Sequence, residues 1–114
     1  MPDQGAQLDT VFRALSDPTR RAVLERLGRG PTPVSELATP FDMALPSFMQ
    51  HLKALEASGL VRSRKSGRVR TYRLEPQALQ RAEGWLTRQR SIWEQRLDQL
   101  DAYVEAMSAK EKKR

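Results

Sequence analysis

The segment covering residues 34–58 constrains the fold most strongly, because it contains two helical patterns with only a short break between them. Residues 34–38 predict a short helix, which Thr39-Pro40 ends. Residues 45–58 predict a longer helix with a polar outer face. This order is typical of a helix-turn-helix motif, whose second helix enters the major groove of DNA. The apolar stripe of the longer helix consists of Leu45, Phe48, Leu52 and Leu55.

The residues after this motif predict a basic β-hairpin. Segments 60–65 and 69–74 contain β-branched or aromatic residues and flank a turn at residues 66–68. The window 62–73 contains no acidic residue. The rest of the chain contains all 14 acidic residues and an equal number of basic ones, so its charges cancel. Such a basic run is by itself more often a solvated surface, but beside a helix-turn-helix motif it indicates the DNA-binding wing of a winged helix. The basic residues of this window are Arg62, Arg64, Lys65, Arg68, Arg70 and Arg73.

Two further helices are predicted before the motif. Apolar residues at helical spacing indicate a helix that begins at Leu8. Asp17 and Pro18 predict the N-cap and the first residue of the next helix, which Gly28 ends. Residues 30–33 predict a turn.

The predicted fold is mainly α with a small β-hairpin, a winged helix-turn-helix in the order α-α-α-α-β-β-α. Gly59 ends the fourth helix, and the last helix begins at about residue 76. We expect a flexible N-terminus over residues 1–7, one DNA-binding and dimerisation domain over 8–107 and a disordered basic tail over 108–114.

The last helix carries an apolar seam, in which Leu86, Trp93, Leu100 and Met107 recur every seven residues. A helix this long cannot bury such a seam against one small domain, so we expect it to pair with a second copy of the chain. The alternative is packing against the first helix. A further alternative is a small-molecule pocket at this seam, lined by Trp85, Trp93 and Tyr103. Aromatic residues at helical spacing, however, more often belong to a core.

The composition argues against several classes of protein. The chain has no cysteine, which excludes disulfides, thiolate zinc sites and iron–sulfur clusters. It has one histidine, no phosphate-binding glycine loop and no carboxylate cluster, so we expect neither enzymatic activity nor a cofactor. The mean hydropathy is -0.66, and no run approaches the roughly 20 apolar residues of a membrane span. The first residues do not resemble a signal peptide, so we expect a cytoplasmic protein.

The strings FRALSDPTRRAVLERL, VSELA, HLKALEASGLV and RKSGRVRTYRL resemble the ArsR/SmtB family of bacterial winged-helix repressors, in the same order and over about residues 8–104. The resemblance implies a homodimer, held by its first and last helices, that binds operator DNA, represses transcription and is released by an effector. The residues expected at the dimer interface are Leu8, Val11, Phe12, Leu86, Trp93, Leu97, Leu100 and Val104.

The chain departs from the metal-sensing members of this family. Founding members have cysteines in the helix that matches residues 34–38, where this chain has Glu36 and no thiol. Others have histidines on the last helix, where this chain has none. His51, the one histidine, with Glu36 or Asp42 would be a poor site for a divalent metal. We therefore expect no metal site, and the sequence leaves the effector undefined.

Four residues of the longer helix are candidates for DNA contact: Ser47, Gln50, His51 and Lys53. Gln50 can bond adenine with two hydrogen bonds, Ser47 can meet a base or a phosphate, and Lys53 can meet a phosphate. His51 either contacts DNA or packs at the edge of the domain. Met49 stands where the family has a small hydroxyl residue, and its side chain cannot donate the hydrogen bond that a hydroxyl would make to DNA.

In the wing, Arg68 and Arg70 are the candidates for the minor groove or its phosphates, and Arg64 and Lys65 are expected to contact phosphates. Because strand residues alternate between two faces, about half of the wing arginines Arg62, Arg64, Arg70 and Arg73 should point elsewhere.

Two alternatives stay open at this point. Arg20 and Arg21, in the family string after Pro18, are more readily explained by helix packing than by phosphate contact. Some winged helices bind proteins or RNA, but the basic wing favours DNA.

Overall fold

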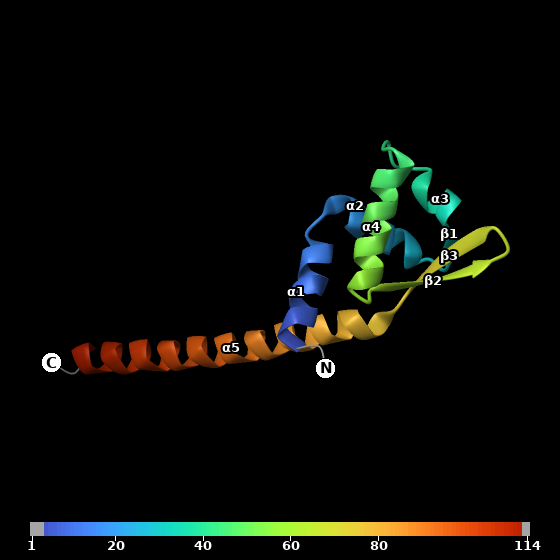
Figure 1. Ribbon diagram of the computed structural model, residues 1–114. Helices are drawn as coiled ribbons and strands as arrows, with labels where there is room; N and C mark the ends of the chain where they lie inside the picture. Colours follow the sequence, from blue (N-terminus) through green and yellow to red (C-terminus); the bar gives the residue numbers. More distant parts are fainter. Residues whose placement is uncertain (1–3, 113–114) are drawn as a thin grey trace. The chain divides into compact units, whose positions relative to one another are not determined.

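The computed structural model describes residues 4–112, which form two compact units. Unit 1 extends to Ala82, and unit 2 begins at Glu83. The elements in chain order (Figure 1) are α1 (Gln4–Leu15), α2 (Pro18–Leu27), β1 (Thr32–Pro33), α3 (Val34–Ala38), α4 (Leu45–Ala57), β2 (Val61–Ser66), β3 (Val69–Leu74) and α5 (Pro76–Lys112).

The first and last helices are longer than the sequence predicted. Helix α1 begins at Gln4 rather than Leu8, and α5 ends at Lys112 rather than near residue 107. Parts of the ends expected to be flexible or disordered are therefore helical, because alanine, glutamine, glutamate and lysine there have high helix propensity. Residues 1–3 and 113–114 of those predicted ends lie outside the described residues.

Helix α4 lies between α1 and the hairpin of β2 and β3, which we call the wing (Figure 1). Phe48, Leu52 and Leu55 are buried, as predicted, and form part of the core of unit 1. Leu45 was expected in the same stripe, but 59% of it is exposed because it is the first residue of α4, beyond the end of the core. The buried apolar core consists of Val11, Ala14, Val23, Leu27, Leu37, Phe48, Leu52, Leu55, Leu60, Val61, Tyr72, Ala78 and Ala82.

The sheet has three strands in the order β1-β3-β2, where the sequence predicted only a hairpin. Residues 30–33 were expected to form a turn, but Thr32 pairs with Tyr72 and Pro33 with Thr71. A strand of two residues has no alternation that a sequence could reveal, and only the tertiary pairing creates it. Proline is tolerated in β1 because β1 is an edge strand.

The predicted helix terminators behave in two ways. Gly59, after α4, has a left-handed φ of 79°, which a residue with a side chain rarely adopts. Gly28 ends α2 as predicted but keeps a right-handed φ of -60°, and the left-handed residue of that connection is Gly30, with a φ of 138°.

The connection between α1 and α2 is held by two arginines. The Arg20 guanidinium donates to the carbonyl oxygens of Ala14 and Arg13, both at 2.8 Å. Arg21 donates to the carbonyl of Leu15 at 2.8 Å. These carbonyls end α1 and have no partner within the helix, so the arginines satisfy them and place positive charge at the negative end of the helix dipole. The structural role favoured for these two arginines is therefore observed.

Asp17 caps α2, as predicted. Its carboxylate accepts a hydrogen bond from the backbone N–H of Arg20 at 3.0 Å, and Pro18 begins the helix. This hydrogen bond is the main cause that lowers the pKa of Asp17 below its ordinary 3.8; burial opposes the shift, and the nearby charges of His51 and Arg20 support it.

The wing is joined to the C-terminal end of α4 through Tyr72. The ring is buried, and its hydroxyl lies against the Glu56 carboxylate of α4. Burial and this neighbouring carboxylate raise the pKa of Tyr72 to about 12, so the folded protein favours the neutral phenol.

We expect Asp17→Ala to lower the free energy of unfolding by about 1 kcal/mol, the usual cost of losing an N-cap. Because folding lowers the pKa of Asp17, its contribution is present above pH 3.8 and is lost as the pH falls through the lowered pKa. Urea unfolding at pH 7 and pH 3 measures both effects. Asp9→Ala, an exposed position of α1, is the matched control, and equal losses in the two variants would contradict the capping role.

We expect the folded protein to show a tyrosine ionisation with a midpoint near pH 12, which Tyr72→Phe removes. The phenol is held in its protonated form, so its contribution to stability is complete below pH 10.0 and is lost as the pH rises through about 12. Absorbance titration measures the ionisation, and circular dichroism shows whether the protein stays folded. Identical titration curves for the wild type and Tyr72→Phe above pH 11 would refute this placement of Tyr72.

Candidate nucleic-acid interface

Helix α4 presents a polar face to solvent. Ser47, Gln50 and Lys53 follow one another at intervals of three residues, and all three are exposed. The inner face of the same helix is fixed by the buried Phe48 and Leu52. Three of the four predicted recognition residues therefore lie together on a rigid, accessible helix face.

His51, the fourth predicted residue, has a different position. Its ring is half-buried, and Nδ1 lies 3.6 Å from an Asp17 carboxylate oxygen and 3.5 Å from an Arg20 guanidinium nitrogen. The ring nitrogen thus faces the connection between α1 and α2 rather than solvent. Sequence reasoning placed His51 at the edge of the domain but gave no signal for these partners, which are 31 or more residues away.

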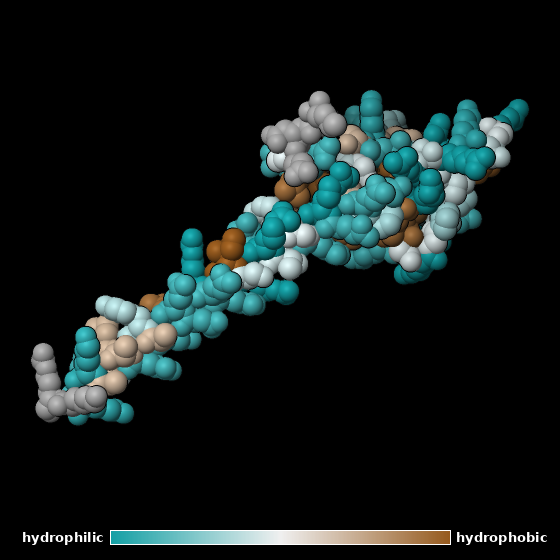
Figure 2. Space-filling model, turned by 90° about the horizontal axis from the view of Figure 1, so that it is seen from below, coloured by the Kyte–Doolittle hydropathy of each residue, from teal (hydrophilic) through white to brown (hydrophobic). Residues whose placement is uncertain are grey.

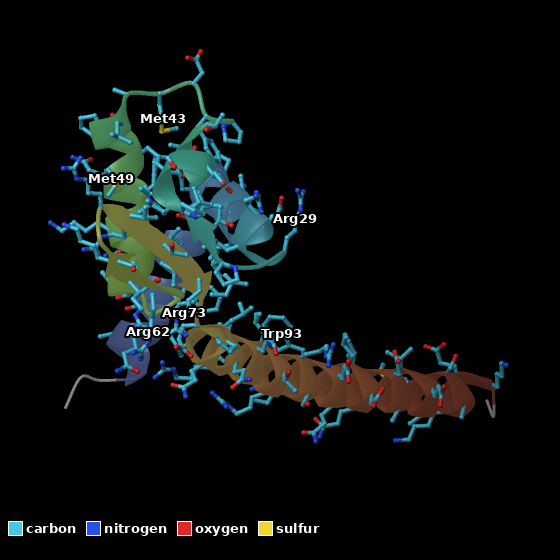
Figure 3. The ribbon with its side chains drawn as sticks, turned by 90° about the vertical axis from the view of Figure 1, so that its right-hand side faces the viewer. Arg29, Met43, Met49, Arg62, Arg73 and Trp93 are labelled. Carbon is cyan, nitrogen blue, oxygen red and sulfur yellow. The ribbon has the colours of Figure 1, made fainter. Side chains whose placement is uncertain are left out.

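Met49 is half-buried on α4 and packs against the core of unit 1 (Figure 3). Its thioether adds apolar contact at the edge of the core. A hydroxyl at this position would not make that contact, so the departure from the family pattern has a packing role in this chain.

The register of the wing separates its basic residues into two faces. Ser63 pairs with the buried Tyr72, and Lys65 pairs with Arg70, so these four share one face. Arg62 pairs with Arg73 on the other face.

Figure 3 shows the Arg62–Arg73 pair at the base of the wing. Arg62 also forms an ion pair with Glu75 at 2.9 Å, which offsets its charge. Arg64, paired with Thr71, lies on the same face as Arg62 and Arg73, so the wing arginines divide three to one rather than the predicted half and half, with Arg70 alone on the face of Tyr72.

Three of the predicted wing residues are exposed around the turn: Arg64, Lys65 and Arg68. Arg70, the fourth, is half-buried, and its guanidinium donates to Ser63 Oγ at 2.8 Å. Ser63 Oγ in turn donates to Glu56 Oε1 at 3.2 Å. Arg70 was expected beside Arg68 as a groove contact, but its side chain is bonded at the base of the wing. Sequence reasoning missed Glu56, Ser63 and Tyr72 as the residues that decide this.

The residues predicted for dimer contact fall into two groups. Val11 is buried in the core of unit 1, so its side chain is not available to a partner, while Leu8 and Phe12 are half-buried against that core. The residues on α5 are all largely exposed, and Figure 2 shows brown atoms among teal ones along this helix. The exposed α5 residues are Leu86, Trp93, Leu97, Leu100 and Val104.

Two further properties concern the class of the protein. Within residues 4–112, no three histidine, cysteine, aspartate or glutamate side chains lie close enough to hold a metal ion. None of the helices in that range is apolar over a length that crosses a membrane.

Comparison with known proteins identifies relatives with this architecture. A helix-turn-helix domain family matches residues 15–64. The HTH-type transcriptional regulator Rv2034 of Mycobacterium tuberculosis is 45% identical over 71 residues, covering 62% of this chain and 66% of that protein. The match thus spans just under two thirds of that relative. The transcriptional repressor SdpR of Bacillus subtilis is 32% identical over 79 residues, covering 69% of this chain and 88% of that protein.

Solved structures agree with these relatives. The crystal structure of an ArsR family transcriptional regulator, RHA00566, has 56% identity and a TM-score of 0.78, and covers 82% of this chain and 97% of that chain. The solution structure of a homodimeric winged helix-turn-helix domain, Mb0332 of Mycobacterium bovis, has 28% identity and a TM-score of 0.60, covering 81% and 91%. Together with the helix-turn-helix and wing of unit 1, these relatives show that the chain belongs to the ArsR family of winged helix-turn-helix, DNA-binding transcriptional regulators.

Proposed function

We propose that this protein is a homodimeric repressor that binds an inverted-repeat operator through α4 and the wing. The observation that carries the proposal is the exposed polar face of α4 combined with the exposed basic residues around the turn of the wing. Ser47 and Gln50 would read base edges in the major groove. The proposed phosphate contacts are Lys53, Arg64, Lys65 and Arg68.

Two residues modify the predicted contact set. We leave Arg70 out of the phosphate contacts because its guanidinium is bonded to Ser63. We assign His51 a positioning role, since its Nδ1 faces Asp17 and Arg20 and anchors α4 to the α1–α2 connection. Leu45, exposed in the first turn of α4, offers an apolar contact for a thymine methyl group.

The homodimer is supported by the apolar face of α5. Five predicted interface residues are exposed on this helix, and exposed apolar surface of this kind is typical of an unpartnered interface. The Mb0332 relative is described as homodimeric. In such a dimer the two recognition helices would reach successive major grooves about 34 Å apart. We place the repressor in the cytoplasm, where the promoter DNA of a bacterium lies.

The first test is selection of bound fragments from random and genomic DNA with the purified protein, at about 0.15 M salt. The proposal predicts an enriched inverted repeat whose half-sites are about one helical turn apart. Binding without any enriched sequence would leave a nonspecific DNA-binding protein. Failure to bind DNA would overturn the proposal and favour a winged helix that binds protein partners.

The salt dependence of binding tests the wing. With four phosphate contacts in each subunit, the logarithm of the association constant should fall with the logarithm of salt concentration at a slope of about -7. Arg68→Ala removes two contacts from a dimer, so we expect a slope of about -5. The control is Arg29→Ala. Met49 belongs to the proposed recognition helix α4, and Arg29 lies on the opposite side of unit 1 from it (Figure 3). A slope that Arg68→Ala leaves unchanged would remove the wing turn from the interface.

The oligomeric state tests α5. Leu97→Glu places a charge in the apolar face, and we expect the dimer dissociation constant to rise at least about 100-fold, which is about 2.8 kcal/mol. Analytical ultracentrifugation measures the change. Gln95→Glu adds the same charge about 200° around the helix and should leave the dimer intact. Equal dissociation constants for the two variants would argue against an α5 interface.

A further inference from the structure

Glu56 is the only acidic residue between Leu45 and Leu74, the stretch that contains α4 and the wing. Seven lysines and arginines lie in the same stretch. DNA phosphates repel a carboxylate placed there, so Glu56 carries a cost in any complex with DNA. Its contacts show what the carboxylate does in the folded protein.

The Glu56 carboxylate connects α4 to both long strands of the wing. It accepts a hydrogen bond from Ser63 Oγ of β2 at 3.2 Å and interacts with the Tyr72 hydroxyl of β3. Ser63 and Tyr72 are cross-strand partners, so a single carboxylate holds the two strands at the base of the wing. The buried Tyr72 ring fixes the same region from the inside.

Arg70 is linked to the same carboxylate through the hydroxyl of Ser63. The Arg70 guanidinium donates to Ser63 Oγ at 2.8 Å and is the one half-buried basic side chain of the wing in the described structure. Arg64, Lys65 and Arg68 are exposed, and the described residues give none of them an ion pair. The basic residues of the wing therefore differ in their freedom to meet a phosphate.

The backbone does not keep Arg70 from DNA. Arg70 pairs with Lys65, one residue pair before the pair Ser66–Val69 that closes the turn. Paired residues point to the same face, so a released Arg70 side chain would extend beside that of Lys65. Among residues 4–112, the contact that directs it toward the base of the wing is its hydrogen bond to Ser63 Oγ, which in turn donates to the Glu56 carboxylate.

We propose that Glu56 limits the sequence-independent part of DNA binding, because it keeps Arg70 from the DNA phosphates and fixes the wing against α4. The inference rests on the proposed DNA-binding function. Phosphate contacts strengthen binding to every sequence, whereas base contacts strengthen binding to the operator alone. By withholding one positive charge from each subunit, Glu56 weakens binding to every sequence, so that a larger share of the remaining affinity for the operator comes from base contacts.

A double-mutant cycle tests this proposal on the full-length dimer. The proteins are the wild type, Glu56→Ala, Arg70→Ala and the double variant, and the probes are the selected operator and a random duplex of equal length. Binding is measured over a series of salt concentrations. Glu56→Ala should steepen the salt slope by about 2, because each released Arg70 neutralises one phosphate. Its affinity should rise about tenfold at about 0.15 M salt for the random duplex and for the operator alike, because a phosphate contact strengthens binding to every sequence.

The other two variants show whether the change in salt slope comes from Arg70. Arg70→Ala alone should leave the salt slope of the wild type unchanged, and in the double variant the slope should return to the wild-type value. A merely structural role of Glu56 would lower the affinity in Glu56→Ala without steepening the slope. Should Glu56→Ala fail to fold, Glu56→Gln carries the test, since its amide oxygen still accepts from Ser63 while the charge is gone.

Glu36→Ala is the matched control for the loss of one acidic residue. Glu36 lies on α3, is exposed and is 3.9 Å from Arg26. Its removal should leave the salt slope unchanged. The inference would be overturned if Arg70→Ala flattened the salt slope, or if Glu56→Ala and Glu56→Gln left the salt slope unchanged. In either case, operator binding by the wild type would still support the proposed function. Absence of any DNA binding by the wild type would instead overturn the function itself.

Discussion

The packing of α4 into the core of unit 1 decides where every side chain of the proposed DNA-binding face can lie. Phe48, Leu52 and Leu55 are at most 1% exposed, and burying each such side chain stabilises the fold by about 1.5–3 kcal/mol. A helix anchored along one face must present the opposite face to solvent, so Gln50 and Lys53 are exposed as a consequence. The rigidity of the recognition helix thus comes from apolar burial on the side away from DNA.

Polar contacts then determine which basic side chains are bonded within the protein and which remain free at the surface. Arg20 and Arg21 satisfy the carbonyl groups that end α1, and Arg62 is paired with Glu75. Arg70 is bonded to Ser63. The role of a basic residue in this protein therefore depends on its hydrogen-bond or ion-pair partner as much as on its charge. The strongly basic window around the wing contains both structural arginines and residues that are free to meet a polyanion.

Much of the architecture could be predicted because its signals are local. The helical spacing of α4 and the Asp17 cap each involve residues within a few positions of one another, and the structure contains both. The helices at the two ends were placed correctly but made too short. The exposed candidates Ser47 and Arg68 also follow from local pattern, since neither depends on a distant partner.

Local patterns in the sequence were enough to predict the order of the five helices and the two wing strands, the position of the basic wing and the family of the chain, because periodicity, caps and motifs act over short distances. The third strand, where Thr32 meets Tyr72, and the half-buried position of His51 beside Asp17 depend on tertiary packing. Tertiary packing also sets the hydrogen bonds of Ser63 to Arg70 and to Glu56. Thr32 and Tyr72 are far apart in the chain, as are Asp17 and His51, whereas Glu56, Ser63 and Arg70 follow at steps of seven residues and meet because the wing folds against α4. Each contact depends on how complete elements pack, which no local pattern encodes.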